Sequence, residues 1–128
     1  MEKNWGKKIW GFPGGFIPAG STGKEPEMLS KDEISILNTA KTDAEILITI
    51  YYADRNPVSG YSITVKAERV KQFRVNDLID PHAIPLGLPY AAILESSVPV
   101  IVQWSKQVTA DGKLGLMGSM AYPIDVEQ

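Results

Sequence analysis

Residues 44–54, Ala-Glu-Ile-Leu-Ile-Thr-Ile-Tyr-Tyr-Ala-Asp, constrain the fold of this chain more than any other stretch. Every second residue is large and apolar, and such residues share one face of a β-strand. They are Ile46, Ile48, Ile50 and Tyr52. The opposite face is mixed, with Glu45, Leu47, Thr49 and Tyr51. A helix is disfavoured because the apolar positions follow a period of two rather than 3.6. We therefore predict a central strand, buried on one face, whose half-apolar second face another subunit covers.

The length and composition of the chain indicate one small globular domain. Its 128 residues fit a single domain, 1–128, and the chain contains no cysteine. This absence excludes disulfides, thiol nucleophiles and thiolate metal sites. No apolar run approaches the roughly 20 residues of a membrane-spanning helix, and no apolar signal region follows the first lysines. We therefore expect a soluble, cytoplasmic protein, and its net charge of −2 argues against broad nucleic-acid binding.

Short alternating segments, separated by turn residues, fill the rest of the chain. We predict further strands over 8–12, 33–39, 60–67, 68–75, 90–95, 98–108 and 114–122. Asn76 or Asp77 would cap one short helical turn that ends before Pro81. Asp111-Gly112 predicts a hairpin turn. This pattern is typical of an all-β protein, an antiparallel β-sandwich or barrel of about eight strands with at most one short helical turn.

The regions outside these strands are predicted to be irregular. Glycine and proline crowd residues 13–26, which indicates an irregular loop. Three apolar residues would hold this loop against the body of the protein: Phe12, Phe16 and Ile17. We expect Val70 and Phe73 to anchor their strand in the core. The termini, 1–8 and 123–128, are polar and are expected to be loosely held.

Few residues have the spacing of a catalytic or metal site. His82 is the single histidine and follows Asp77 and Asp80 in the pattern D-x-x-D-x-H. One imidazole and two carboxylates could hold a metal ion. The spacing matches no common metal motif, so we expect a turn whose carboxylates accept backbone N–H groups. No serine lies in a G-x-S-x-G elbow. We predict no enzyme, metal or cofactor, although a carboxylate pair for glycoside hydrolysis stays open because distances are invisible in a sequence.

Basic and aromatic residues suggest two further kinds of contact. The densest basic stretch holds Lys66, Arg69, Lys71 and Arg74. It could meet phosphates, but the interleaved Glu68 favours a solvated strand edge. Aromatic residues on the predicted strands could bind sugar rings, although core packing or a subunit interface is the simpler interpretation. They are Trp10, Tyr51, Tyr52, Tyr61, Trp104 and Tyr122.

Several blocks follow one another in a distinctive order. The most specific are Arg74-Val75-Asn76-Asp77-Leu78-Ile79-Asp80-Pro81 and Val98-Pro99-Val100-Ile101-Val102-Gln103, preceded by Phe16-Ile17-Pro18, Ile36-Leu37-Asn38 and Ile50-Tyr51-Tyr52-Ala53-Asp54. With these blocks the chain resembles the soluble cyanobacterial sensory rhodopsin transducer family over most of its length. The resemblance implies a jelly-roll β-sandwich that assembles as a homotetramer, without catalytic residues. It also implies signalling beside a membrane photoreceptor, and relatives are thought to bind sugars or DNA. The hairpin 107–116 departs from the family pattern and is a candidate partner surface.

We therefore predict a non-catalytic signal-transducer-like module that binds a small ligand, such as a sugar, or a protein partner such as a sensory rhodopsin. The predicted ligand residues are polar, lie near strand ends and fall on the family-like blocks. They are Asn38, Tyr52, Arg74, Asn76, Asp77 and Gln103. Two alternatives stay open. One is a DNA-binding regulator that uses the basic stretch on a tetramer, and the other is a carbohydrate-active enzyme.

Overall fold

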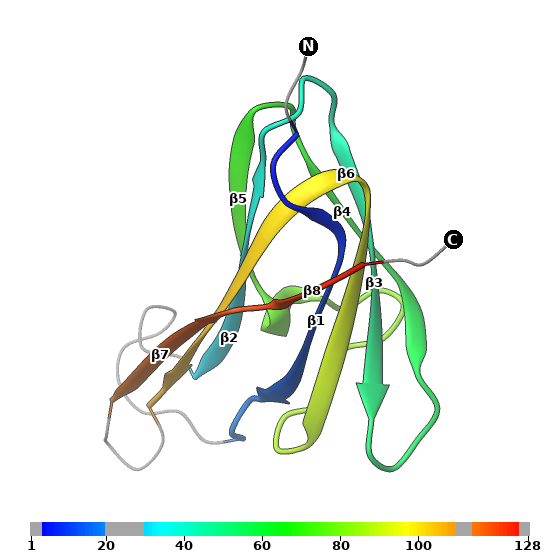
Figure 1. Cartoon of the computed structure of the whole chain (residues 1–128). Coiled ribbons are helices and arrows are strands. Elements are labelled where there is room, and N and C mark those ends of the chain that lie inside the picture. Colours follow the sequence, from blue (N-terminus) through cyan, green and yellow to red (C-terminus); the bar gives the residue numbers. More distant parts are fainter. Residues whose placement is uncertain (1–3, 20–29, 110–113, 126–128) are drawn as a thin grey trace.

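The structure, a computed structural model, describes residues 4–19, 30–109 and 114–125. This part of the chain forms eight antiparallel strands and one 3₁₀ turn (Figure 1). The strands are β1 (Lys7–Phe16), β2 (Lys31–Asn38), β3 (Ala44–Tyr52), β4 (Val58–Val65), β5 (Arg69–Arg74), β6 (Pro89–Val108), β7 (Gly115–Met120) and β8 (Tyr122–Ile124), and the turn η1 spans Val75–Asp77. The predicted all-β class and strand number are confirmed.

Strand β6 organises the sheet, because it pairs with four other strands. It is 20 residues long and arches across the molecule (Figure 1). Its first half pairs with β1 and β3, and its second half pairs with β2 and β7. Pro99 lies between the ladder with β3, which ends at Ser96, and the ladder with β2, which begins at Ile101. A residue without an N–H is tolerated at such a changeover.

The prediction of two separate strands over 90–95 and 98–108 was wrong. Ser96 and Ser97, which lie between the two predicted strands, accept hydrogen bonds from the backbone. Ser97 Oγ accepts a hydrogen bond from the backbone N–H of Glu45 at 2.9 Å, and Ser96 Oγ accepts one from Val98 at 3.4 Å. The strand therefore continues through the bend.

The sheet folds into two layers that share β6. One layer, with the order β4-β3-β6-β1-β8, faces a second layer made of β5, β2, the second half of β6 and β7 (Figure 1). The inward residues form one apolar core, which includes Ile46, Ile48 and Ile50 of β3. Burying each isoleucine side chain contributes roughly 1.5–3 kcal/mol to stability. The predicted β-sandwich and the buried face of β3 are confirmed.

Strand β1 extends into the predicted irregular loop, so the loop prediction was wrong for residues 13–16. The register of β1 against β6 shifts between Phe12 and Gly15, after which pairing resumes at Gly15 opposite Tyr90. A Cβ at Gly15 would lie only 2.3 Å from the Tyr90 ring. Glycine is therefore needed here for close packing rather than for a loop. Residues 20–26 of the predicted loop lie outside the described residues.

Several predicted anchors of the core behave differently. Two of the residues expected to hold the 13–26 loop are buried: Phe12 and Ile17. Phe16, in contrast, is exposed, and so is Val70, at 65%. Val70 pairs with Leu37, which also faces outward, so the anchoring role predicted for Val70 was wrong. Phe73 packs partly buried against the core, as predicted.

The C-terminal strand predicted over 114–122 is two strands. Ala121 divides them, because its side chain is buried and its backbone N–H donates to Val102 O at 3.2 Å. The chain thereby crosses from β7, which pairs with β6, to β8, which pairs with β1. The ordered strands begin at Lys7 and end at Ile124, closer to the termini than predicted. The Asp111-Gly112 turn lies outside the described residues.

The predicted helical turn is confirmed as η1, but the predicted capping is wrong. The N-cap position is Arg74, and no side chain caps the turn. Buried Val75 pins the turn to the core instead. Asn76 and Asp77 lie inside the turn, where their side chains make other contacts.

Candidate functional site

The largest hollow described is an apolar groove on the outer face of the β4-β3-β6-β1-β8 layer. Its volume is about 640 Å³. The residues that line this groove come from β1, β3, β6 and β8: Gly11, Phe12, Pro13, Tyr51, Ala91, Ala92, Ile93, Tyr122 and Ile124. None of them carries a charge. An uncharged hollow on an open sheet face is the kind of feature that marks an interaction site.

Strand pairing explains why the groove forms. Gly11 of β1 lies between Ile93 of β6 and Tyr122 of β8. Because Gly11 has no side chain, the floor of the groove stays low. A Cβ there would lie 2.8 Å from Ile93 Cδ1. Tyr51 and Tyr122 flank this floor and are 44% and 72% exposed.

A smaller hollow of about 200 Å³ continues from the groove toward Tyr52 and Pro89, and shares Tyr51 and Pro13 with it. The guanidinium of Arg55 lies 5.2 Å from the centre of the Tyr52 ring. Burial raises the pKa of Tyr52, and the positive charge of Arg55 acts in the opposite direction. Tyr52 therefore stays a neutral hydroxyl at physiological pH.

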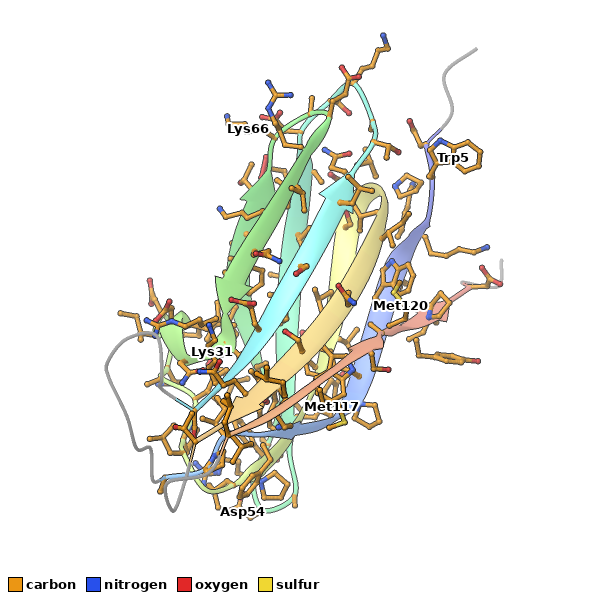
Figure 2. All side chains as sticks on the ribbon, turned by 90° about the vertical axis from the view of Figure 1, so that its left-hand side faces the viewer. Trp5, Lys31, Asp54, Lys66, Met117 and Met120 are labelled. Atoms are coloured by element: carbon orange, nitrogen blue, oxygen red, sulfur yellow. The ribbon has the colours of Figure 1, made fainter. Side chains whose placement is uncertain are left out.

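Strand β7 is a second apolar surface. Its six residues are all exposed, and β6 is the one strand with which it pairs in the described sheet. Figure 2 shows Met117 and Met120 along this strand, and both are more than half exposed. Leu116 is 70% exposed. The region includes part of the predicted 107–116 hairpin, whose residues 110–113 lie outside the described residues.

A third hollow, of about 380 Å³, lies beside β7 on the other layer. Its lining is polar at one end, where Lys31 Nζ lies 3.6 Å from the carboxylate of Glu33. Lys106 also borders this hollow, but its charge is already compensated by Asp32.

Asp32 is the centre of a buried polar cluster that the sequence analysis missed. Its Oδ1 accepts from Lys106 Nζ at 2.7 Å, and its Oδ2 accepts from the Tyr90 hydroxyl at 2.5 Å and from Phe16 N at 3.0 Å. Lys106 also donates to the carbonyl of Phe16. Burial, reinforced by the neighbouring Asp32 carboxylate, raises the pKa of Tyr90 far above its usual range. The cluster joins three strands, and the Asp32 carboxylate at its centre is closed to a ligand, since Asp32 is 1% exposed.

Asn38, one of the predicted ligand residues, is buried and fully engaged by its own chain. Its Nδ2 donates to the carbonyls of Thr42 at 2.9 Å and Val65 at 3.1 Å. Its Oδ1 accepts from Ala40 N at 2.9 Å. These bonds hold the connection between β2 and β3.

The predicted residues Arg74, Asn76 and Asp77 do lie together, at η1. The Arg74 guanidinium makes two bonds to the Asp77 carboxylate, at 2.9 and 3.1 Å. Asn76 Nδ2 donates to Ser30 O at 3.0 Å, while its buried Oδ1 has no hydrogen-bond partner among the described residues. The donor fork of Arg74 is thus already occupied by an intramolecular carboxylate.

The other predicted ligand residues lie elsewhere. Tyr52 pairs with Tyr90 at the end of β3, and Gln103 is exposed on β6 between Ser35 and Met120. Asn38 lies at one end of the β2–β5 ladder, where it pairs with Arg69, and Arg74 lies at the other end. The structure therefore brings together three of the six predicted residues, and whether they bind a ligand stays a prediction.

The basic residues predicted for nucleic-acid binding lie along and beside the edge strand β5. Lys66 Nζ lies 3.4 Å from Asp43, and Arg74 pairs with Asp77. Lys71 donates to the carbonyl of Thr64 at 3.3 Å, and Arg69 donates to that of Glu68 at 3.0 Å. Each of these cations contacts an oxygen of its own chain, which would compete with a phosphate.

The described residues contain no group of three metal-ligating side chains. His82 is exposed, and its carbonyl accepts a hydrogen bond from the Tyr61 hydroxyl at 2.5 Å. No helix in the described part of the chain is long and apolar enough to span a membrane.

Sequence reasoning found part of the groove. Tyr51 lies on the face of residues 44–54 that was predicted to be covered by another subunit, and Tyr122 was among the noted aromatic residues. Gly11 and Ile93 were not found. Their role depends on the pairing of β1 with β6, which no local pattern encodes.

Comparison with known proteins gives the family of this chain. Residues 5–123 match the family described as Anabaena sensory rhodopsin transducer. The chain resembles the structure titled Crystal Structure of Thermotoga maritima 1070, with a TM-score of 0.81, 30% identity, and coverage of 93% of this chain and 96% of that chain. It also resembles the Anabaena sensory rhodopsin transducer itself, with a TM-score of 0.73, 41% identity, and coverage of 80% and 89%. No curated protein matches the chain significantly.

Proposed function

We propose that this chain, which belongs to the Anabaena sensory rhodopsin transducer family, is a non-catalytic signalling module that acts by binding a protein partner. The apolar groove between Tyr51 and Tyr122 is the observation that supports this function most directly. It is uncharged, open to solvent and built on paired strands. Such a surface can dock a partner without reorganisation of the backbone.

A protein partner fits the groove better than a sugar does. Sugar hydroxyls require hydrogen-bonding groups, and a site that leaves them unpaired loses affinity. The lining of the groove offers the Tyr51 and Tyr122 hydroxyls and otherwise apolar side chains. The predicted polar residues Asn38 and Arg74 already bond to their own chain. An apolar side chain of a protein would bury area here without such a penalty.

The family suggests the class of partner. One relative of known structure carries the name Anabaena sensory rhodopsin transducer, so a membrane photoreceptor of the sensory rhodopsin class is the first candidate. We place this chain in the cytoplasm, where it would meet the cytoplasmic surface of such a receptor. A module of this kind would need no catalytic residue, because it would pass on the signal by binding its partner.

We also propose that the chain forms a homo-oligomer, as the predicted tetramer requires, and that β7 takes part in it. An edge strand with unpaired backbone groups invites pairing, and proteins usually protect such edges with charge or proline. The edge strand β5 follows this rule with Arg69, Lys71 and Arg74. β7, Gly115–Met120, contains neither a charged residue nor a proline. Its unprotected edge is what one expects of a strand that another copy covers.

Binding to a receptor is the direct test of the function. The purified chain is immobilised, and a sensory rhodopsin in lipid nanodiscs is passed over it, with empty nanodiscs and a receptor of another class as controls. Saturable binding to the sensory rhodopsin supports the proposal. Binding that is equal for all three samples would rule out this receptor class.

The small-ligand, DNA and carbohydrate-enzyme interpretations are tested together. A thermal-shift screen against sugars, nucleotides and duplex DNA reports selective binding, because a ligand of the folded state raises the unfolding midpoint with concentration. A sugar response lost in Asn76→Ala would make η1 the ligand site. A DNA response that falls steeply with salt would favour the basic stretch. Turnover of a glycoside would contradict the non-catalytic role.

A further inference from the structure

We infer that the outer face of the β4-β3-β6-β1-β8 layer binds a partner segment that combines an apolar anchor with basic residues. This inference rests on the proposed function and specifies the chemistry of the partner. It follows from two features of one surface: the apolar groove described above, and an acidic end of the same face. The acidic end consists of Glu45 and Glu95, with Leu47 beside them.

Strand alternation places both features on the same face. Along β6 the outward side chains are Ala91, Ile93 and Glu95, while the residues between them, Ala92 and Leu94, are buried in the core. Ala91 and Ile93 line the groove. Glu95 follows directly, flanked by Leu47 of β3 and Ile9 of β1. A segment lying along β6 would therefore touch the groove and then the carboxylate.

The acidic end carries negative charge that its surroundings leave largely uncompensated. Glu95 is exposed, and its carboxylate has no ion-pair or hydrogen-bond partner among the described residues. The Glu45 carboxylate accepts one hydrogen bond, from Thr64 Oγ1 at 2.5 Å. Glu45 is the diagonal neighbour of Glu95 across the β3–β6 ladder, at a distance of roughly 7–8 Å between Cα atoms. Lys7, at the start of β1, is already paired with Asp125 at 2.7 Å.

Leu47 adds an apolar side chain beside the two carboxylates. It is 40% exposed between the carboxylates, and a shallow hollow of about 140 Å³ lies beside it, bordered by Ser62 and Ile63 of β4. An aliphatic stem of lysine or arginine can lie on such an apolar side chain while its charged end reaches a carboxylate.

The spacing of the two features defines the partner segment. Ala91 and Glu95 are four residues apart on β6, which corresponds to about 13 Å along a strand. An extended partner would place its apolar anchor over Ala91, at the far side of the groove, and its basic residue about four positions away. A helical partner would need about nine positions for the same distance.

The charge on this face argues against a second copy of the chain as the occupant. The acidic end of one copy would lie either against the acidic end of the other, where like charges disfavour association, or against its uncharged groove, where the carboxylates would lose water without gaining a partner. A basic segment is attracted instead. Cytoplasmic loops of membrane proteins are enriched in lysine and arginine next to apolar spans, so the chemistry of the face suits the receptor class proposed above.

The test uses short fluorescent peptides with an apolar core of leucine and phenylalanine. One peptide carries flanking lysines, the second carries glutamates at the same positions, and the third keeps the lysines but has serines in the core. We expect the lysine peptide alone to bind the full chain in fluorescence anisotropy, with an affinity that falls as salt rises. Binding of the glutamate peptide, or no binding of the lysine peptide, would overturn the inference.

Variants then locate the site. Glu95→Lys and Tyr122→Ala are expected to weaken binding of the lysine peptide roughly tenfold each. Gly11→Leu should block the groove, and the two surface variants keep the test valid if Gly11→Leu does not fold. Gln72→Lys and Val70→Ala are the matched controls, since they change charge and apolar area on the outer face of the other layer. Equal affinity of Glu95→Lys, Tyr122→Ala and the controls would show that the surface is wrong.

Further measurements separate this inference from its rivals and from the proposed function. If Tyr122→Ala dissociates an oligomer in sedimentation while peptide binding is absent, the face is an interface between copies and the inference fails. If a sensory rhodopsin in nanodiscs binds the wild type and Glu95→Lys equally, the proposed function stands and only this docking surface fails. Loss of receptor binding in Glu95→Lys and Tyr122→Ala, but not in Gln72→Lys, supports both.

Discussion

Asp32 joins parts of the chain that are far apart in sequence. Tyr90 and Lys106 belong to the two ends of the same strand, β6, yet both donate to this one carboxylate. They meet because β6 arches and brings its ends to the same side of the molecule (Figure 1). The ammonium of Lys106 also lies 5.9 Å from the centre of the Trp104 ring. The Asp32 carboxylate therefore links the two ends of the arched strand β6 through hydrogen bonds.

Removing the Asp32 carboxylate should be costly. Asp32→Ala leaves the ammonium of Lys106, which is only 14% exposed, without its partner, and an uncompensated buried charge costs about 3–5 kcal/mol. Urea denaturation would measure this loss in the free energy of unfolding. Glu33→Ala is the matched control, because its carboxylate is more exposed and pairs loosely, so it should cost no more than about 1 kcal/mol. Equal losses in both variants would contradict a stabilising role for the cluster.

Tyr90 predicts how stability depends on alkaline pH. Burial raises the pKa of its hydroxyl, so the folded chain retains a proton that the unfolded chain loses above about pH 10. The unfolded state then binds fewer protons, and the free energy of unfolding falls as pH rises. Below that pH the contribution of Tyr90 is fully present. We expect Tyr90→Phe to show a shallower decline of stability above about pH 10 than the wild type, and Tyr122→Phe to keep the wild-type profile. An unchanged slope in Tyr90→Phe would exclude this origin.

At the scale of elements, the pairing of β1 with β6 shows that close packing can keep a strand regular where the local sequence predicts a loop. The glycines and proline near the end of β1 resemble a loop, yet the strand continues because Gly15 fits under the Tyr90 ring. The same pairing leaves Gly11 as the low floor of the groove. Gly15 thus allows close packing against Tyr90, and Gly11 of the same strand keeps the groove open on the outer face.

Gly15→Ala tests this packing. Its Cβ would overlap the Tyr90 ring, and such overpacking costs typically 1–3 kcal/mol. The free energy of unfolding from a denaturant titration would show the loss. Gly14→Ala is the control in the neighbouring position, since no atom lies within 4 Å of its Cβ, and it should change stability by no more than about 0.5 kcal/mol. If both variants were equally stable, β1 would tolerate movement away from Tyr90.

At the scale of the molecule, two apolar surfaces have different neighbours. The groove lies on a sheet face beside the carboxylates of Glu45 and Glu95, whereas β7 is an uncharged edge. An edge can extend a sheet through backbone hydrogen bonds, while a face can only receive side chains. This difference leads us to propose a second copy at β7 and a foreign basic segment at the groove.

Charge on β7 should therefore weaken self-association. We expect Leu116→Lys and Met120→Lys each to shift the sedimentation profile toward the monomer, with at least roughly tenfold weaker association, because a lysine on an edge strand opposes pairing. Ser62→Lys on β4, an edge strand of the other layer, is the control and should leave the profile unchanged. An oligomer that survives both β7 variants would place the interface elsewhere, and a monomeric wild type would exclude it.

The sequence by itself determined the all-β class and the buried face of β3, because alternation is a local property of the backbone. The predicted number of strands also agrees, but only because joining two predicted strands in β6 offsets the division of one into β7 and β8. The sequence also predicted that another subunit covers the opposite face, which carries Leu47 and Tyr51. This stays a prediction, and the charges of Glu45 and Glu95 lead us to propose a foreign basic segment there instead. The sequence misled at Pro13, where a turn residue occurs within a strand, and at residues 96–97, where the predicted gap between two strands is part of β6.

Only the tertiary structure decided which strands pair and what their pairing brings together. Asp32 meets Tyr90 and Lys106, and Gly11 meets Ile93 and Tyr122, through contacts between distant segments. The tertiary structure also gives Asn38 and Arg74 hydrogen-bond partners within the chain. Both residues were predicted from the sequence as ligand residues. The physical reason is that periodicity selects the face of a strand on which a side chain lies, whereas its neighbours on that face depend on how β6 bends between the two layers.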